Sequence, residues 1–351
     1  MKIKHYIFSC ILLVLFSCTK RKDLMLLVEV ENKAIADQVD IEKFISLKVQ
    51  SAFDLDPDAI YDMKREGSKV SFKIKSTGEN KGIIEELGAV FNSGGRGIEF
   101  WETYENSEIS KDISVLDDSL LAMTRSTNAE PTPAAGLRTL QEKVDSMNKG
   151  QVKSRERTIY SLMKPAVYLN GTTTSFLPGS IIGYVNPSDT ARLNAYIKIG
   201  FRQLILPPSL VIKFKRSDTD PKTLEVYALK YSNFKKQPAL FGDIIDDARI
   251  DMTDYGMESI TFNMKKGFVE SWARLTRKAS PKGMERGKSI AIVVDGILLT
   301  CPTVNAEIPN GNCSISGNFT PQECRNIQRK LKSVYFPYRT TLLQCALAEE
   351  Q

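Results

Sequence analysis

Apolar and polar positions in the first third of the chain alternate in short segments that predict a small mixed unit. Apolar residues recur at helical spacing in two segments and run as short strands in four others. The sequence Arg65-Glu66-Gly67-Ser68 between two of the strands predicts a hairpin turn. In chain order the predicted elements are a strand at 24–30, a helix at 41–53, strands at 59–63 and 70–74, a helix at 83–91 and a strand at 98–104. This βαββαβ order is typical of the ferredoxin-like fold.

Residues 107–158 have a different composition, rich in Ser, Thr and Asp, with a helix-breaking sequence at Glu130-Pro131-Thr132-Pro133. One short helix is predicted at 137–147. Polar stretches of this kind are typical of segments that join domains. We therefore expect a base at 24–106, followed by a connector.

From residue 159 the pattern predicts longer strands with helices between them, and hence a second, larger α+β domain at 159–335. The last helix has the clearest start signal. Thr320 and Glu323 have the spacing of a capping box, and Pro321 suits the first helical position. Strands are predicted at 181–185, 211–215, 224–229, 259–263, 290–294 and 298–301, with helices at 189–199, 268–276 and 321–331.

The first residues are those of a secretory signal. Lys2 and Lys4 precede an apolar run at 6–16 that is too short to span a membrane. Leu15-Phe16-Ser17-Cys18 resembles the bacterial lipobox, so we expect 1–17 to be a signal peptide, Cys18 to be the lipidated (palmitate-bearing) N-terminus, and 18–23 to be a tether. An ordinary cleaved signal or an uncleaved anchor is the alternative. We expect no transmembrane helix, and a protein on the bacterial envelope facing the periplasm.

Charge is unevenly distributed. Residues 25–106 carry 10 basic and 16 acidic side chains, a net of −6, whereas 107–351 carry 33 and 25, a net of +8. The basic part of the chain could attract an acidic partner or an anionic lipid. The alternative is that these charges only keep the surface solvated. No nucleic-acid-binding motif is present, so nucleic acid is not an expected partner.

The sequence gives little support for catalysis. Its single histidine, His5, lies in the expected signal peptide, which argues against Ser-His and Cys-His nucleophile pairs and against histidine metal sites. Ser-x-x-Lys at Ser161 and Lys164 has no supporting Ser-Asp-Asn or Lys-Thr-Gly. The acidic cluster of Asp243, Asp246 and Asp247 lacks a calcium-loop pattern. We expect no enzyme activity, cofactor or metal.

The segment SIAIVVDGILLTCPTVNAEIPNGNCSISGNFTPQECRNIQRKL, residues 289–331, resembles the head of the first periplasmic domain of the secretion protein SecD. The resemblance extends upstream through GDIIDDAR at 242–249 to GYVNPSDTARLNAYI at 183–197 and GIEFWETYEN at 97–106. The residues that match the SecD pattern include Gly242, Asp246, Ala291, Asp295, Gly296, Pro302, Gly311, Ile315, Gly317 and Phe319.

These residues have physical roles that do not depend on the family. Asp295-Gly296 between two apolar strands predicts a hairpin turn whose central residues need positive φ. Gly311 and Gly317 flank a short strand as turn glycines. Phe319 precedes the Thr320 cap, where an apolar side chain stabilises the start of the helix. They are expected to specify a fold rather than to carry chemistry.

The resemblance implies binding of unfolded secretory polypeptides next to the Sec translocon, in a lipoprotein form of the SecD domain without its membrane helices. The rival hypothesis is an interaction or structural lipoprotein that docks on another envelope complex. The resemblance also implies that the chain returns from the head to complete the base at about 338–348.

Besides Cys10 and Cys18, the chain has Cys301, Cys313, Cys324 and Cys345, with no C-x-x-C spacing. Four cysteines allow three pairings, or none. Cys301 ends one predicted strand and Cys313 begins another in the same domain, so this pair is our candidate disulfide.

Overall fold

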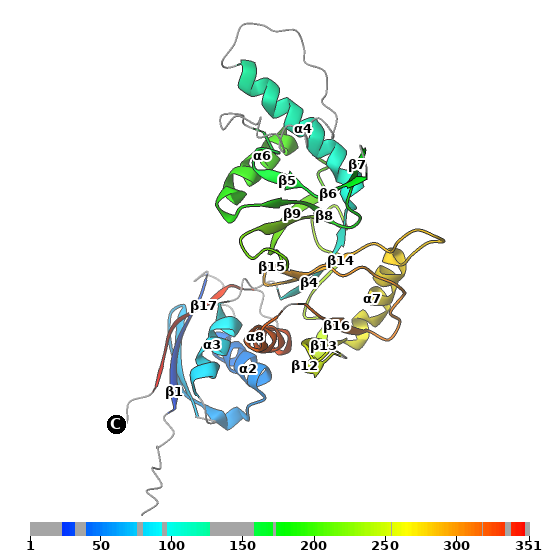
Figure 1. The fold of residues 1–351 in the computed structure, drawn as a ribbon. Helices are drawn as coiled ribbons and strands as arrows, with labels where there is room; N and C mark the ends of the chain where they lie inside the picture. Colours follow the sequence, from blue (N-terminus) through cyan, green and yellow to red (C-terminus); the bar gives the residue numbers. More distant parts are fainter. Residues whose placement is uncertain are drawn as a thin grey trace, which may run out of the picture.

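The computed structural model describes residues 23–31, 40–75, 80–92, 97–126, 158–170, 173–253, 255–317, 319–333 and 338–347. Figure 1 shows a base at the lower left and a larger head whose two halves lie above it and to its right. The predicted α+β class is confirmed, and the strands of the described residues form four mainly antiparallel sheets. Within the described ranges, no helix combines the length and apolar character that a membrane crossing requires.

The base is a four-stranded antiparallel sheet with two helices on one face (Figure 1). Its strand order is β17-β1-β3-β2. Leu26, Val28 and Phe72 point from the sheet toward Ile45 and Phe91 on the helices, and all five side chains are buried. The elements are β1 (Leu24–Val30), α2 (Ile41–Phe53), β2 (Ile60–Glu66), β3 (Lys69–Ile74), α3 (Asn80–Phe91) and β17 (Thr340–Leu347).

The strand that we expected to close the base, at 98–104, does not belong to it. Residues Ile98–Thr103 form β4, which pairs with β14, β10 and β11 of the head. Phe100 enters one head core and Trp101 enters another on the opposite face. A strand buried on both faces needs a sheet that is covered on both faces. The base sheet has helices on one face, so β4 packs better in the head.

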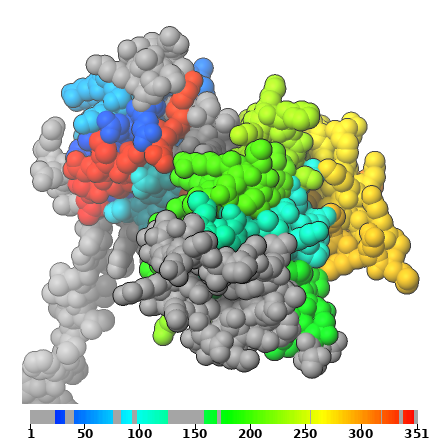
Figure 2. Space-filling view, turned by 90° about the horizontal axis from the view of Figure 1, so that it is seen from above, coloured from blue at the N-terminus to red at the C-terminus, as the bar shows by residue number. Residues whose placement is uncertain are grey.

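Strand β17 takes the fourth place of the ferredoxin-like order. It runs antiparallel to β1, from Leu24 opposite Leu347 to Val30 opposite Thr340, with one bulge. Figure 2 shows the red C-terminal strand lying against the blue N-terminal strand. The Thr340 hydroxyl donates a 2.6 Å hydrogen bond to the Phe91 carbonyl and so ties β17 to α3. The head is therefore inserted in the base between helix α3 and strand β17.

The first part of the expected connector is a helix. Residues Asn106–Ser126 form α4, and Ile109, Ile113, Leu116 and Leu120 are buried along one side of it. The Ser and Asp residues that suggested a connector lie between or beside these positions: Ser107 is exposed, whereas Asp117 is buried and accepts a 3.0 Å hydrogen bond from the Tyr160 N–H. The predicted helix at 137–147 lies outside the described residues.

One half of the head is built on an eight-stranded sheet. Six strands are neighbours across the sheet in the order β15-β14-β4-β10-β8-β5, while β9 pairs with β10 and β11 pairs with β4. Helices α4 and α6 lie against its upper part in Figure 1. The further elements are β5 (Met163–Pro165), β6 (Val167–Asn170), β7 (Thr173–Phe176), β8 (Ile181–Val185), α6 (Thr190–Arg202), β9 (Leu210–Arg216), β10 (Leu224–Lys230), β11 (Leu240–Gly242), β14 (Ile290–Val294) and β15 (Ile297–Thr300).

The other half is a three-stranded sheet, β12-β13-β16, packed against two helices. Trp272 of α7 is buried in its core, with its ring 4.8 Å from that of Phe100 on β4. This contact joins the two halves of the head. The elements are β12 (Ile245–Met252), β13 (Glu258–Met264), α7 (Lys266–Ala279), β16 (Asn312–Ile315) and α8 (Pro321–Lys332). Two short 3₁₀ turns lie at Pro57–Ala59 and Pro187–Asp189.

Two glycines of the head provide a matched test of its packing. A Cβ atom on Gly287 would lie 1.9 Å from the Val304 carbonyl oxygen, whereas a Cβ on Gly267 of α7 would meet nothing within 4 Å. We expect Gly287→Ala to lower the free energy of unfolding by about 1–3 kcal/mol through overpacking. Gly267→Ala should leave it unchanged or raise it by up to about 1 kcal/mol. Urea unfolding followed by circular dichroism measures both, and equal stabilities of the two variants would contradict the packing described here.

Candidate functional site

Helix α8 connects the head to the base. Thr320 caps its first turn: the Glu323 N–H donates to the Thr320 hydroxyl at 3.2 Å, and the Thr320 N–H donates to the Glu323 carboxylate at 2.8 Å. The predicted capping box is therefore confirmed, with Pro321 in the first turn. Figure 1 shows α8 beside α2 and α3 of the base.

Arg329 makes the central polar contact of this junction. Its Nε donates to the Glu86 carboxylate of α3 at 2.9 Å, and its Nη1 donates to the Ala52 carbonyl of α2 at 2.9 Å. The guanidinium carbon also lies 4.8 Å from the centre of the Phe53 ring. Glu86 is 5% exposed, and Arg325 also lies 3.4 Å from its carboxylate, so two arginines offset the cost of burying this charged side chain. The contact therefore resists movement of the head relative to the base.

The Asp295-Gly296 turn lies at the same junction. It joins β14 to β15 with φ values of 51° and 84°, as the sequence predicted. The Asp295 carboxylate forms an ion pair with Lys330 of α8, whose Nζ lies 3.2 Å from Oδ2. Lys48 of α2 is buried nearby, and its Nζ lies 3.5 Å from the Ser333 hydroxyl. The turn thus meets both the base and α8.

Gly317 and Phe319 lie just before α8 in the chain and also belong to the junction between head and base. A Cβ on Gly317 would lie 3.0 Å from the Phe319 ring, so the glycine allows that ring to lie against the backbone. Phe319 packs on the head core. The other matching residues have structural positions: Ala291 and Ile315 are buried, Pro302 accepts a backbone bond from Ile290, Gly242 and Gly311 have positive φ, and Asp246 is exposed on β12.

A small apolar pocket lies between these elements. We call it the junction pocket; its volume is about 210 Å³. Ile297, which follows the Asp295-Gly296 turn, is 61% exposed beside it, an unusual position for a large aliphatic side chain. The apolar lining consists of Ala89 of the base and Val294, Ile297, Leu299, Phe319 and Ile327 of the head. Glu323, Asn326 and Lys330 also line the pocket, and its apolar part suits one apolar side chain of a ligand.

Sequence reasoning missed this pocket. The motif residues Asp295, Gly296, Gly317 and Phe319 were assigned to the fold, but together they position its walls. The available signal was Ile297 itself, an apolar residue next to a tight turn. The contribution of Ala89 follows from the docking of α8 on the base, which no local pattern predicts.

The expected disulfide is not formed. Cys301 and Cys313 are both free thiols, as are Cys324 and Cys345. Cys301 packs against the Trp101 core, with its sulfur 3.1 Å from the Ser180 hydroxyl. Cys313 lies on β16 opposite Phe262 and packs against a different core. Burial raises the pKa of each of these two thiols to about 12, so both are poor nucleophiles.

The other candidate residues from the sequence are Cys18 and the acidic cluster that contains Asp243. Cys18 lies outside the described residues. Asp243 of the acidic cluster forms an ion pair with Lys265 at 2.7 Å. Among the residues that the structure describes, no three His, Cys, Asp or Glu side chains gather closely enough to hold a metal ion.

Residues 222–337 match the family model of the SecDF P1 head subdomain. This segment contains β14, β15, Phe319 and α8, which supply most of the junction pocket. The match thus supports a SecD periplasmic domain in the part of the chain that carries the candidate site.

Several protein translocase SecD subunits are similar to this chain. The subunit of Rhodothermus marinus is 30% identical over 168 residues, which cover 47% of this chain and 26% of that protein. That of Leptotrichia buccalis is 29% identical over 105 residues, covering 30% and 24%. A crystal structure of SecDF in a super-membrane-facing form has a TM-score of 0.45 and 13% identity, covering 92% of this chain and 30% of that one. The chain spans about a quarter of the length of the curated relatives.

Lys48 allows a test of the junction by pH. Burial lowers its pKa from 10.5 to about 8, with Lys330 adding to the effect and Asp295 opposing it. Between pH 8 and 10.5 the unfolded chain therefore binds more protons than the folded one, so this lysine's penalty is full below pH 8 and disappears as pH rises to 10.5. We expect Lys48→Met to raise the free energy of unfolding at pH 7 by about 1–3 kcal/mol.

The gain should shrink as pH approaches 10.5. Lys266→Met, at an exposed lysine of α7, is the control and should show no such pH-dependent difference from wild type. Urea titrations at several pH values measure both variants. A destabilised Lys48→Met protein, or a gain that does not change with pH, would contradict the buried position of Lys48.

Proposed function

We propose that this chain is an accessory of Sec-dependent protein export that binds unfolded polypeptide in the junction pocket. The observation that carries the proposal is an apolar pocket built largely by the segment that matches the SecDF P1 head subdomain, with Ile297 exposed beside it. Similarity to SecD subunits of the protein translocase supports a role of this chain in protein export. Unfolded chains present apolar side chains that folded proteins bury, which is the chemistry that such a pocket recognises.

The proposal requires no catalysis. Binding of an extended segment needs an apolar surface and a fixed geometry, and the contacts of Arg329 with Glu86 and Ala52 provide that geometry at the junction. The protein would act from the periplasmic side of the envelope, attached through a lipid on Cys18, with Sec translocon components as neighbours.

Ile297 is the residue to test, because its exposure means that a polar substitution costs little stability. Ile297→Ser should weaken binding of a fluorescently labelled, permanently unfolded secretory protein about fivefold to tenfold, through loss of apolar contact. Met252→Ser on β12 is the matched control, since Met252 is 65% exposed on a strand away from the pocket. Fluorescence anisotropy with the purified chain measures the dissociation constants.

Equal weakening by both substitutions would place binding on general surface hydrophobicity rather than in the pocket. If the wild type binds no unfolded protein at high micromolar concentration while a folded envelope protein co-purifies with it in equal amounts, the rival docking function replaces polypeptide capture.

Lipidation at Cys18 is tested separately. Cells that express the protein and receive a fatty-acid analogue should incorporate label into the wild type, because the lipobox cysteine is the acceptor. A Cys18→Ala variant should carry none. Equal label on the two proteins would disprove the anchor without affecting the binding proposal.

A further inference from the structure

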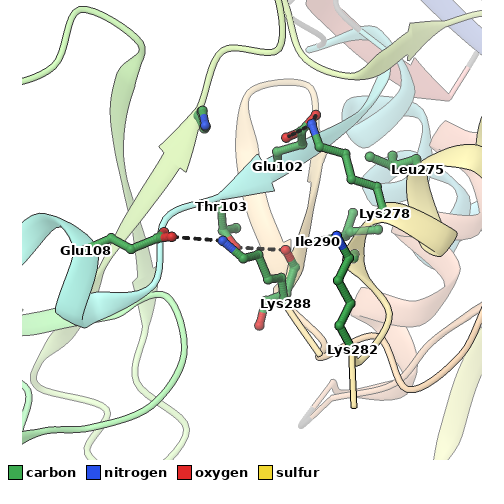
Figure 3. A pocket seen from close by; sticks show the side chains of 11 residues that line it. Glu102, Thr103, Glu108, Leu275, Lys278, Lys282, Lys288 and Ile290 are labelled. Carbon is green, nitrogen blue, oxygen red and sulfur yellow. Dashed lines mark hydrogen bonds and ion pairs between the residues drawn. The ribbon is translucent and has the colours of Figure 1, made fainter. Parts of the chain in front are cut away.

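A second pocket lies between the two halves of the head; β14 lines it through Ile290, whereas Val294 of the same strand lines the junction pocket. Its volume is about 220 Å³. Leu275 and Ala279 of α7 and Ile290 of β14 provide apolar walls. The opposite side is formed by Glu102 and Thr103 at the end of β4 (Figure 3). We call it the lysine pocket, after the four lysines that surround it: Lys230, Lys278, Lys282 and Lys288.

Two of these lysines are held by carboxylates. Lys278 donates to Glu102 at 2.7 Å, and Lys288 donates to Glu108 of α4 at 2.9 Å (Figure 3). The hydrogen bond with Glu108 raises the pKa of Lys288, so it stays charged at neutral pH. These pairs join α7 and the loop after it to β4 and α4. They therefore fix the rim of the pocket.

The other two lysines have no carboxylate at ion-pair distance, although the charge of Lys230 acts on Glu108 from farther away. Within the described residues, Lys230 and Lys282 form no ion pair; Lys230 lies 5.3 Å from the centre of the Tyr104 ring. Figure 3 shows the Lys282 side chain running toward Ile290. Four lysines and two glutamates leave a net charge of two positive units beside apolar walls. This combination suits a ligand with an apolar part and a carboxylate close to it.

The size of the pocket decides between ligand classes. About 220 Å³ holds a group of side-chain size, whereas the acyl chain of a lipid is much longer. The rim is made of lysines, which attract a single carboxylate as point charges, and it lacks the arginine fork that favours bidentate phosphate binding. Both arguments favour a polypeptide over an anionic lipid.

We propose that the lysine pocket binds an acidic residue of an unfolded polypeptide together with an apolar neighbour of that residue. The proposal rests on the proposed function, because its ligand is the same kind of polypeptide. It adds a second contact on the head and a preference for clients in which acidic and apolar residues are adjacent. The carboxylate enters between Lys230 and Lys282, while Glu102 and Glu108 keep their own lysines.

The experiment uses two labelled unfolded peptides that share their apolar residues and differ only in Glu versus Gln at positions beside them. The purified chain should bind the Glu peptide about fivefold more tightly at low salt, and the difference should fall as salt is added. In a Lys230→Gln/Lys282→Gln variant the two peptides should bind equally. Lys266→Gln, which removes one exposed lysine of α7 outside the pocket, should keep the preference.

A thermal melt of each variant confirms that the chain is folded before binding is compared. Equal binding of both peptides to the wild type, or a Glu preference that survives the double substitution, overturns the lysine pocket while leaving polypeptide capture intact. Absence of binding by either peptide overturns the proposed function itself. Phosphatidylglycerol vesicles form a third arm: vesicle binding that depends on Lys230 and Lys282, without Glu-peptide preference, would assign the pocket to lipid.

Discussion

The pairing of β17 with β1 is the constraint on which the arrangement of this protein depends. Without it, β1 would be an open edge, and the base would be a three-stranded sheet under two helices. Because β17 follows the head in sequence, the base is completed by a strand from beyond the head, and β4 is free to enter the head sheet. The head is thus connected to the base at both of its ends, which limits where α8 can lie.

Within that limit, buried charges select the orientation. Glu86 of the base and Asp295 of the head are each largely buried and each paired with a basic residue of α8. Removing charges from water costs free energy that such pairs recover only when their geometry is kept. Any other position of α8 would leave these carboxylates unpaired. The junction pocket exists in one defined shape for this reason, although its walls come from segments more than two hundred residues apart.

Local signals predicted a good part of this structure. The Asp295-Gly296 turn, the Thr320 capping box and the hairpin at Gly67 all follow from side-chain and φ requirements of a few neighbouring residues. The errors have one common cause. The positions of β4, α4 and Cys313 depend on which distant surface covers them, and alternation along a strand does not say which sheet it joins. Ile297 directly precedes the predicted strand at 298–301 and begins β15 in the structure, and its exposure beside a pocket became visible after α3 and α8 were in place.

The central claim is that unfolded polypeptide contacts the head at the junction pocket. Its most direct test is site-specific photocrosslinking in cells, with a photoreactive amino acid at position 297 and, for comparison, at position 252 during export of a slowly folding secretory protein. If polypeptide binds at the junction pocket, crosslinks to the secretory chain from position 297 will exceed those from position 252 and disappear once the chain has folded. Crosslinks from position 297 to one folded envelope protein, with none to secretory chains, would contradict it.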